Sequence, residues 1–161
     1  MGSALFANQR ETNLASTIAL VEEVLAELGH DAGHEVGTSR GAGNALHAWE
    51  VRKGSALTRV SLVSRTEFTH LRVCSTVMTL DPRVDRPALH AHLLELNGGL
   101  CGAAFATEAD HVLLLAERST LDLDRSEVRE LIRRVTTYAD DHDDVLVSRF
   151  GGAMGSGDTS L

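Results

Sequence analysis

Three strand-like segments follow one another between residues 49 and 80 with no helical pattern between them. In the first, apolar Trp49 and Val51 alternate with charged residues, the period of a half-buried strand. A turn at residues 53–55 separates it from a second alternating segment at 59–62, and a third, rich in β-branched residues, runs from Phe68 to about Leu80. Strands that follow one another as hairpins form an antiparallel sheet. This arrangement excludes a parallel, doubly wound fold.

Two helical patterns bracket these strands. Between residues 14 and 28 the apolar positions recur at steps of three and four, and Gly29 ends the pattern. After the third strand, Asp85 and Pro87 form a helix start, because a carboxylate caps the first turn and proline needs no partner there. This second helix is expected to end at residues 97–99, Asn-Gly-Gly.

A third helix closes the chain. Asp124 and Glu127 have the spacing of a capping box. An apolar stripe follows, consisting of Val128, Leu131, Ile132, Val135, Tyr138, His142, Val145 and Leu146. Two short strands, near residues 102–107 and 112–118, precede this helix. The predicted order is α-β-β-β-α-β-β-α, an α+β protein whose helices pack on an antiparallel sheet.

The length of 161 residues favours a single domain that is large enough to bury its own core. We expect residues 1–10 to be a flexible N-terminus and residues 11–152 to form the domain. Residues 153–161 lie in the glycine-rich segment that follows Phe150, and we expect them to be a disordered tail.

The formal charge of -8 disfavours nucleic acid or an anionic membrane surface as a partner. Cys74 and Cys101 show no CxxC spacing, which fits a reducing compartment. The longest uninterrupted apolar run, residues 112–116, is too short to cross a bilayer, and no leader pattern is visible. These observations predict a cytoplasmic protein.

Residues 37–41, GTSRG, match the G-x-S-x-G pattern of hydrolase nucleophile elbows, with Ser39 at the centre. An elbow needs a buried strand before the serine and a helix after it, because that geometry directs backbone N–H groups at the oxyanion. Glycines surround Ser39 on both sides instead. We interpret His30–Gly43 as a loop and predict no catalytic residue there.

The sequence predicts no metal site and no cofactor. Of the eight histidines, His30 and His34 have a chelating i, i+4 spacing, but adjacent glycines disfavour the helix it requires. His90 and His92 point to different sides of the second helix. The acidic run at residues 140–144 lacks the glycine turn of a calcium loop.

Residues 93–124, LLELNGGLCGAAFATEADHVLLLAERSTLDLD, and the closing SRFGG form a familiar pattern. The chain resembles the YbjN-domain proteins, whose fold is that of the type III secretion chaperones. In that family a helix ending in Leu-Asn precedes a strand hairpin, a polar loop and a long amphipathic helix. Leu96 and Asn97, Phe105, and Leu121 with Asp124 occupy these places, and the resemblance covers residues 11–152.

This resemblance implies a small acidic protein, commonly dimeric, that binds a polypeptide or takes part in regulation. The family brings no catalytic residues with it. We therefore expect a non-enzymatic, chaperone-like or regulatory homodimer with an unidentified polypeptide partner. The alternative is a small enzyme or ligand-binding domain that uses the His30–Gly43 loop.

The expected partner or dimer surface follows from the strand parity and from the second helix. The third strand has apolar side chains on both parities, and three helices leave little cover for one of its faces. We predict that this face and one side of the second helix form the surface, through Phe68, Cys74, Met78, Leu89 and Leu93.

Overall fold

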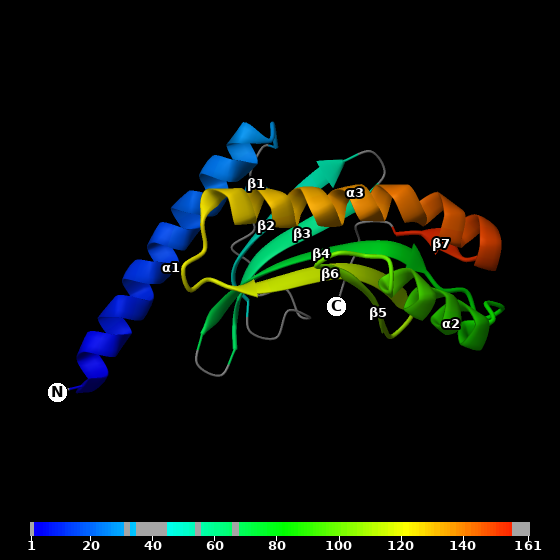
Figure 1. Ribbon diagram of the computed structural model, residues 1–161, viewed down its shortest axis with the longest axis horizontal. Coiled ribbons are helices and arrows are strands. Elements are labelled where there is room, and N and C mark those ends of the chain that lie inside the picture. The colour runs from blue at the N-terminus through cyan, green and yellow to red at the C-terminus, as the bar shows by residue number, and fades with distance from the viewer. Residues whose placement is uncertain (1, 31–32, 35–44, 54–55, 66–67, 156–161) are drawn as a thin grey trace.

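A computed structural model describes residues 2–30, 33–34, 45–53, 56–65 and 68–155, with side chains from residue 13 onward except at residues 33, 34, 53 and 56. Helices pack on an antiparallel sheet (Figure 1). The elements in chain order are α1 (Gly2–Glu27), β1 (Gly33–His34), β2 (Ala45–Lys53), β3 (Ala56–Ser64), β4 (Thr69–Thr79), α2 (Arg86–Asn97), β5 (Ala104–Glu108), β6 (His111–Ser119), α3 (Arg125–Phe150) and β7 (Ala153–Met154).

The seven-stranded sheet has the order β1-β2-β3-β4-β6-β5, and β7 pairs with the end of β4. Every pairing is antiparallel. The predicted α+β class and the order of the main elements are confirmed. The two-residue strands β1 and β7 were not predicted, because segments this short carry no periodicity.

Helix α1 begins at Gly2, much earlier than the apolar pattern near residue 14 indicated, and within the segment expected to be flexible. Its end is as predicted. Gly29 has φ of +75°, and the amides of Gly29 and His30 donate to the carbonyls of Ala26 and Leu25. This is a Schellman ending, which requires a residue that tolerates positive φ.

The predicted starts of the other two helices are confirmed. Asp85 caps α2 by accepting a hydrogen bond from the Ala88 amide at 3.1 Å. At α3, the Glu127 amide donates to the Asp124 carboxylate, and the Asp124 amide donates to the Glu127 carboxylate, each at 3.0 Å. This reciprocal pair is the capping box that the sequence spacing predicted.

One face of the sheet carries the core. Helix α3 packs across β3, β4 and β6, while α1 packs against α3 and α2 against β5. The largest fully buried side chains come from helices and strands alike: Trp49, Leu25, Leu62, Leu71, Met78, Leu89, Leu114, Ile132 and Leu146. Val145 is an exception to the predicted stripe, since it is 56% exposed on α3.

After α3 the chain turns back onto the sheet. Gly151 and Gly152 both have positive φ, +82° and +86°, which reverses the chain direction. Strand β7 then pairs Met154 with Met78 and Ala153 with Thr79 (Figure 1). Residues 153–154, expected to be disordered, are thus part of the sheet, because the two glycines permit the turn.

Candidate polypeptide-binding surface

The five residues predicted to form a partner or dimer surface lie in two different environments. Phe68 is 52% exposed before β4, and Cys74 is half-buried on β4. The side chains of Met78, Leu89 and Leu93 are buried within the chain itself. The structure brings these three into the core and leaves only Phe68 strongly exposed.

Met78 is buried, although it was predicted at a surface, because β4 is irregular. The β4–β6 register shifts between Thr76 and Met78, so parity counted from Cys74 does not hold at Met78. Strand β7 also pairs directly with this residue. The register shift turns Met78 to the helix-covered face, where its side chain joins the core of this chain.

Leu89 and Leu93 were also predicted at a surface, and they are buried for another reason. They lie on the side of α2 that joins the hydrophobic core, and α2 packs against β5. The outward side of α2 carries Leu94, which is 71% exposed. Of these three leucines, Leu94 alone is exposed to solvent, since Leu89 and Leu93 are part of the core.

The register shows which residues share the sheet face opposite the helices. Arg59 pairs with Cys74, which pairs with Leu115, and the next row contains Ser61, Arg72 and Glu117. Directly paired residues of antiparallel strands lie on the same face. No described helix covers this face, which we call the second face of the sheet.

Three exposed apolar side chains gather toward one end of the sheet. Phe68 and Leu121 adjoin Thr69 and Thr120 in sequence, and the Thr120 amide donates to the Thr69 carbonyl at 2.9 Å. Leu46 follows Ala45, which pairs with the end of β3. Phe68, Leu46 and Leu121 are 52%, 49% and 55% exposed. We call these three residues the apolar end; sequence parity identified only Phe68, because Leu46 and Leu121 lie beside irregular segments.

An ion-pair network stiffens the sheet beside the apolar end. The Arg65 guanidinium donates to both carboxylate oxygens of Glu117 at 2.7 Å, and Arg72 donates to one at 3.3 Å. The hydrogen bonds from Arg65 hold the pKa of Glu117 below its ordinary value, against a smaller opposing effect of burial. This network connects the β3–β4 turn to β6 and so fixes the backbone that presents Phe68.

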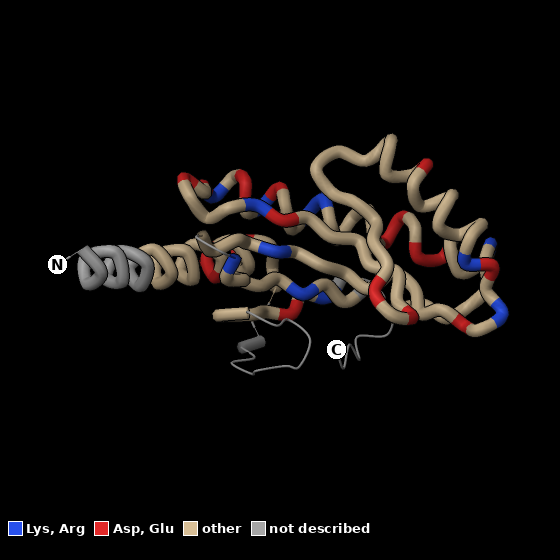
Figure 2. Tube along the Cα trace, turned by 90° about the horizontal axis from the view of Figure 1, so that it is seen from below, with Lys and Arg blue, Asp and Glu red and all other residues tan. Residues whose placement is uncertain are grey.

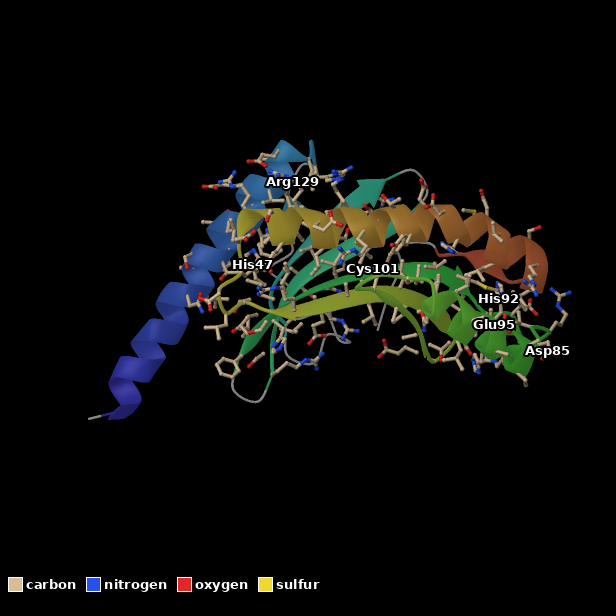
Figure 3. The ribbon with its side chains drawn as sticks, in the orientation of Figure 1. His47, Asp85, His92, Glu95, Cys101 and Arg129 are labelled. Carbon is tan, nitrogen blue, oxygen red and sulfur yellow. The ribbon has the colours of Figure 1, made fainter. Side chains whose placement is uncertain are left out.

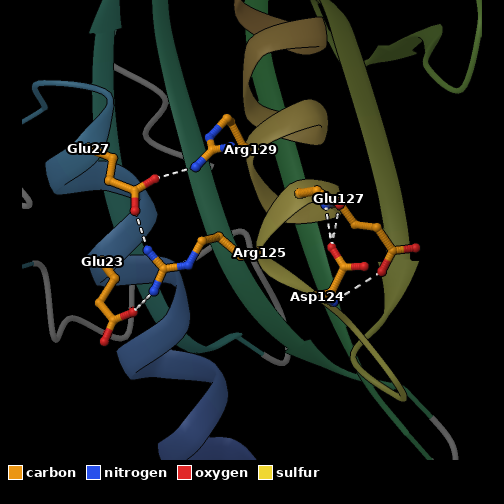
Figure 4. Close-up of polar contacts among 7 residues, drawn as sticks. Glu23, Glu27, Asp124, Arg125, Glu127 and Arg129 are labelled. Carbon is orange, nitrogen blue, oxygen red and sulfur yellow. Dashed lines mark hydrogen bonds and ion pairs between the residues drawn. The ribbon is translucent and has the colours of Figure 1, made fainter.

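A second ionic cluster joins the first and last helices (Figure 4). Arg125 donates to Glu23 and Glu27, and Arg129 donates to Glu27. The hydrogen bond from Arg129 is the main cause of the lowered pKa of Glu27. These pairs are partly exposed, so we assign them to helix orientation rather than to a large share of stability.

The side chain of Asn97 occupies the free edge of strand β5. Asn97, the last residue of α2, accepts a hydrogen bond from the Phe105 amide at 2.6 Å and donates to the Phe105 carbonyl at 3.2 Å. Its amide thus takes the place that a neighbouring strand would take. This contact gives the Leu-Asn pair of the sequence pattern a structural role.

Aromatic contacts connect α2 to the C-terminal end of α3. The His92 and Phe150 rings lie 5.5 Å apart, and Arg149 lies within 3.4 Å of the His92 ring nitrogens. Figure 3 shows His92 and Glu95 on α2 beside this end of α3. These contacts join α2 to the C-terminal end of α3, against which β7 also packs.

The residues considered for catalysis do not form a recognisable reactive site in the described part of the chain. Ser39 lies outside the described residues, as does most of the His30–Gly43 loop. Burial raises the pKa of the Cys74 thiol, which disfavours the thiolate that a nucleophile needs. Within the described ranges, no group of three or more His, Cys, Asp or Glu side chains could hold a metal ion. Among the same residues, no helix is long and apolar enough to cross a membrane.

Comparison with solved structures shows the same fold in chains of two protein complexes. The chain is similar to a protein in the crystal structure of the ExsC–ExsE complex, with a TM-score of 0.56, 12% identity, and 82% of this chain and 94% of the other covered. It is also similar to a chain of the HopA1–SchA chaperone–effector complex, with a TM-score of 0.53, 10% identity, and 83% and 97% covered. No curated protein matches the sequence.

The sequence also matches a family model, described as T3SS (YopN, CesT) and YbjN peptide-binding chaperone 1, over residues 15–156. This range includes the Leu-Asn pair at the end of α2, the capping box of α3 and the strand β7. The resemblance inferred from the sequence is confirmed, and the chain belongs to the family of T3SS and YbjN peptide-binding chaperones.

Proposed function

We propose that this chain is a non-enzymatic, cytoplasmic chaperone that binds a polypeptide client and acts as a homodimer. The observation that carries the proposal is the family match over residues 15–156. One of the similar structures is a complex of a chaperone with an effector, and the other is the ExsC–ExsE complex. Neither nucleic acid nor a membrane surface is part of the proposal, because the net charge is -8.

The apolar end is the proposed client surface. Exposed, clustered apolar side chains on an otherwise well-covered protein typically mark a contact site. Phe68 supplies the largest apolar area, and Leu46 and Leu121 extend it. Cys74, half-buried on the second face of the sheet, lies on β4, the strand that Phe68 precedes, and widens the proposed surface. Figure 2 shows the Lys and Arg positions distributed over helices and strands, without one basic field.

The outward side of α2 is the proposed dimer contact. Leu94 is the most exposed large apolar side chain among the described residues. The buried side of α2, with Leu89 and Leu93, holds the helix in place, so that Leu94 is presented on a rigid element. In this proposal, Leu89 and Leu93 support the dimer surface from beneath.

The client can be identified and then tested in purified form. The tagged chain is isolated from its own cells, and a polypeptide that co-purifies is produced separately and titrated into the pure chain by calorimetry. We expect saturable binding that Phe68→Asp weakens. If Phe68→Asp, Leu46→Asp and Leu121→Asp all leave the binding affinity unchanged, the apolar end is not the client surface.

The homodimer has an independent test. Light scattering coupled to size-exclusion chromatography is expected to give twice the chain mass of 17.3 kDa, and Leu94→Glu is expected to give a folded monomer whose melting temperature no longer depends on protein concentration. A monomer mass for the unsubstituted chain at all micromolar concentrations would contradict the homodimer.

The alternative function, an enzyme or ligand-binding domain, rests on the His30–Gly43 loop. A fluorophosphonate probe and metal analysis of the purified protein address it directly. We expect neither serine labelling nor stoichiometric metal, and Ser39→Ala is expected to leave stability and client binding unchanged. Labelling that disappears in Ser39→Ala would favour the enzyme.

A further inference from the structure

We propose that the end of β4, from Thr76 to Thr79, is a strand-acceptor site for extended segments of the form Gly-x-apolar-Gly. In the free chain, the C-terminal strand β7 fills this site. The inference rests on the proposed function, because it specifies a sequence class of client segment that would replace β7.

The backbone of β4 defines the site. Strand β3 pairs with β4 only as far as Ser75, and beyond it β7 takes over the pairing. The Gly155 amide donates to the Val77 carbonyl at 3.2 Å, which extends the contact past Met154. The end of β4 thus offers main-chain pairing to an antiparallel segment, the interaction on which strand addition depends.

Two close approaches set the glycine requirement. A Cβ atom on Gly155 would lie 1.9 Å from the Thr76 carbonyl oxygen. One on Gly152 would lie 2.5 Å from the Thr79 carbonyl oxygen and 2.9 Å from Cε of Met78. The nearest atoms are backbone oxygens, which cannot rotate away as a side chain does. A segment that takes the place of β7 therefore needs glycine at both positions.

The two residues between these glycines have different environments. Ala153 is exposed, so this position tolerates a range of side chains. Met154 is half-buried and pairs with Met78, whose side chain is fully buried. The geometry thus selects an apolar residue at the second position, which completes the Gly-x-apolar-Gly form.

The connection between α3 and β7 permits exchange. Gly151 caps α3 by donating to the Val147 carbonyl at 2.9 Å, and a Cβ atom on Gly151 would meet nothing within 4 Å. The next residue, Gly152, also has positive φ. A two-residue strand joined through two glycines can leave β4 without displacing the buried stripe of α3. The site is then open to another segment.

A direct test uses the full chain and a fluorescent peptide with the sequence of residues 150–155, FGGAMG. In Gly155→Val the chain's own strand no longer fits, so the acceptor is empty. Because a competing internal strand lowers apparent affinity by the fraction of empty acceptor, we expect Gly155→Val to bind the peptide at least about tenfold more tightly than the unsubstituted chain. A peptide with valine in place of its last glycine is the matched control and is expected not to bind.

A disulfide lock keeps the inference testable if Gly155→Val does not fold. Thr79→Cys and Ala153→Cys place cysteines at paired positions, in a Cys74→Ala, Cys101→Ser background. The oxidised chain is expected to lose peptide binding and the reduced chain to regain it. Absence of peptide binding to both Gly155→Val and the reduced chain, or binding that the lock does not change, would overturn the inference. Client binding measured on the same locked chain separates the two proposals: if the locked chain still binds client, the strand-acceptor inference alone fails.

Discussion

The two ends of the sheet are similar in composition but differ in what covers them. At one end, β7 lies against Met78, Asn97 occupies the edge of β5, and Arg86 pairs with Asp110 at 2.5 Å beside the β5–β6 turn. At the other end, Phe68 and Leu121 lie just beyond the paired residues, Leu46 lies at a bulge of β2, and all three stay exposed. Apolar residues occur at both ends, but at the β7 end the strongly exposed one, Leu94, lies on α2 rather than beside a strand of the sheet.

This difference shows that the exposure of an apolar residue depends on the face to which it is turned and on what covers that face, as well as on its apolar character. Met78 and Phe68 are both apolar, both were predicted on the same face of the third strand, and both were expected at a surface. Met78 is buried because the register shift in β4 turns it to the helix-covered face, where it joins the core, and β7 pairs beside it. Phe68 precedes Thr69, the first paired residue of β4, and stays 52% exposed.

The largest expected effect separates the two sides of α2. Leu93→Ala empties a buried position and is expected to lower the free energy of unfolding by about 2–5 kcal/mol, because transfer and cavity costs add. Leu94→Ala, on the adjacent exposed position, is the matched control and is expected to change it by less than about 0.5 kcal/mol. Urea denaturation of both variants measures this. Equal effects would show that Leu93 is not a core residue.

The next effect concerns the closed edge of the sheet. Asn97→Ala removes the partner of both main-chain groups of Phe105, and we expect a loss of roughly 1–3 kcal/mol in unfolding free energy. Asn97→Asp retains an acceptor for the Phe105 amide but lacks the donor, so an intermediate loss is expected. A thermal melt in which Asn97→Ala is as stable as the unsubstituted chain would show that water replaces the side-chain amide without cost.

The sequence predicts local structure well and coverage poorly, for a physical reason. The caps at Asp85 and Asp124 and the stop at Gly29 depend on residues within one helical turn, so their patterns are visible in the sequence. The burial of Met78 depends on a register shift and on a two-residue strand from the far end of the chain. No local periodicity encodes either of these.

The candidate surface shows the same limit. Phe68 was identified because it begins a regular strand, whereas Leu46 and Leu121 stand beside a bulge and a loop, where parity has no meaning. The role of Asn97 was not predicted from the sequence either, because an asparagine at the end of a helix is ordinarily explained by its backbone preference alone. Its contact with Phe105 becomes visible only when α2 is placed beside β5.

A smaller effect depends on pH and tests the network beside the apolar end. The pKa of Glu117 in the folded chain lies below its ordinary value of 4.5 because Arg65 and Arg72 stabilise the carboxylate. Its contribution to stability is therefore present above pH 4.5 and is lost as the pH falls through the lowered pKa. We expect Glu117→Gln to melt below the unsubstituted chain at pH 7, with the difference shrinking on acidification. A difference that is constant from pH 7 to pH 3 would exclude an ionic origin.

The smallest effect on stability is expected at Phe68, where the effect on binding is expected to be large. Phe68→Ser removes an exposed ring, so the free energy of unfolding should change by less than about 0.5 kcal/mol. If the apolar end holds the client, the same change should weaken binding by roughly tenfold or more, as truncation of an aromatic anchor does. Val145→Ser, at a 56% exposed position on α3, is the matched control and should leave binding unchanged. Calorimetric titration of both variants with the client measures this difference. If both substitutions weaken binding equally, or if neither weakens it, exposure alone does not locate the client surface.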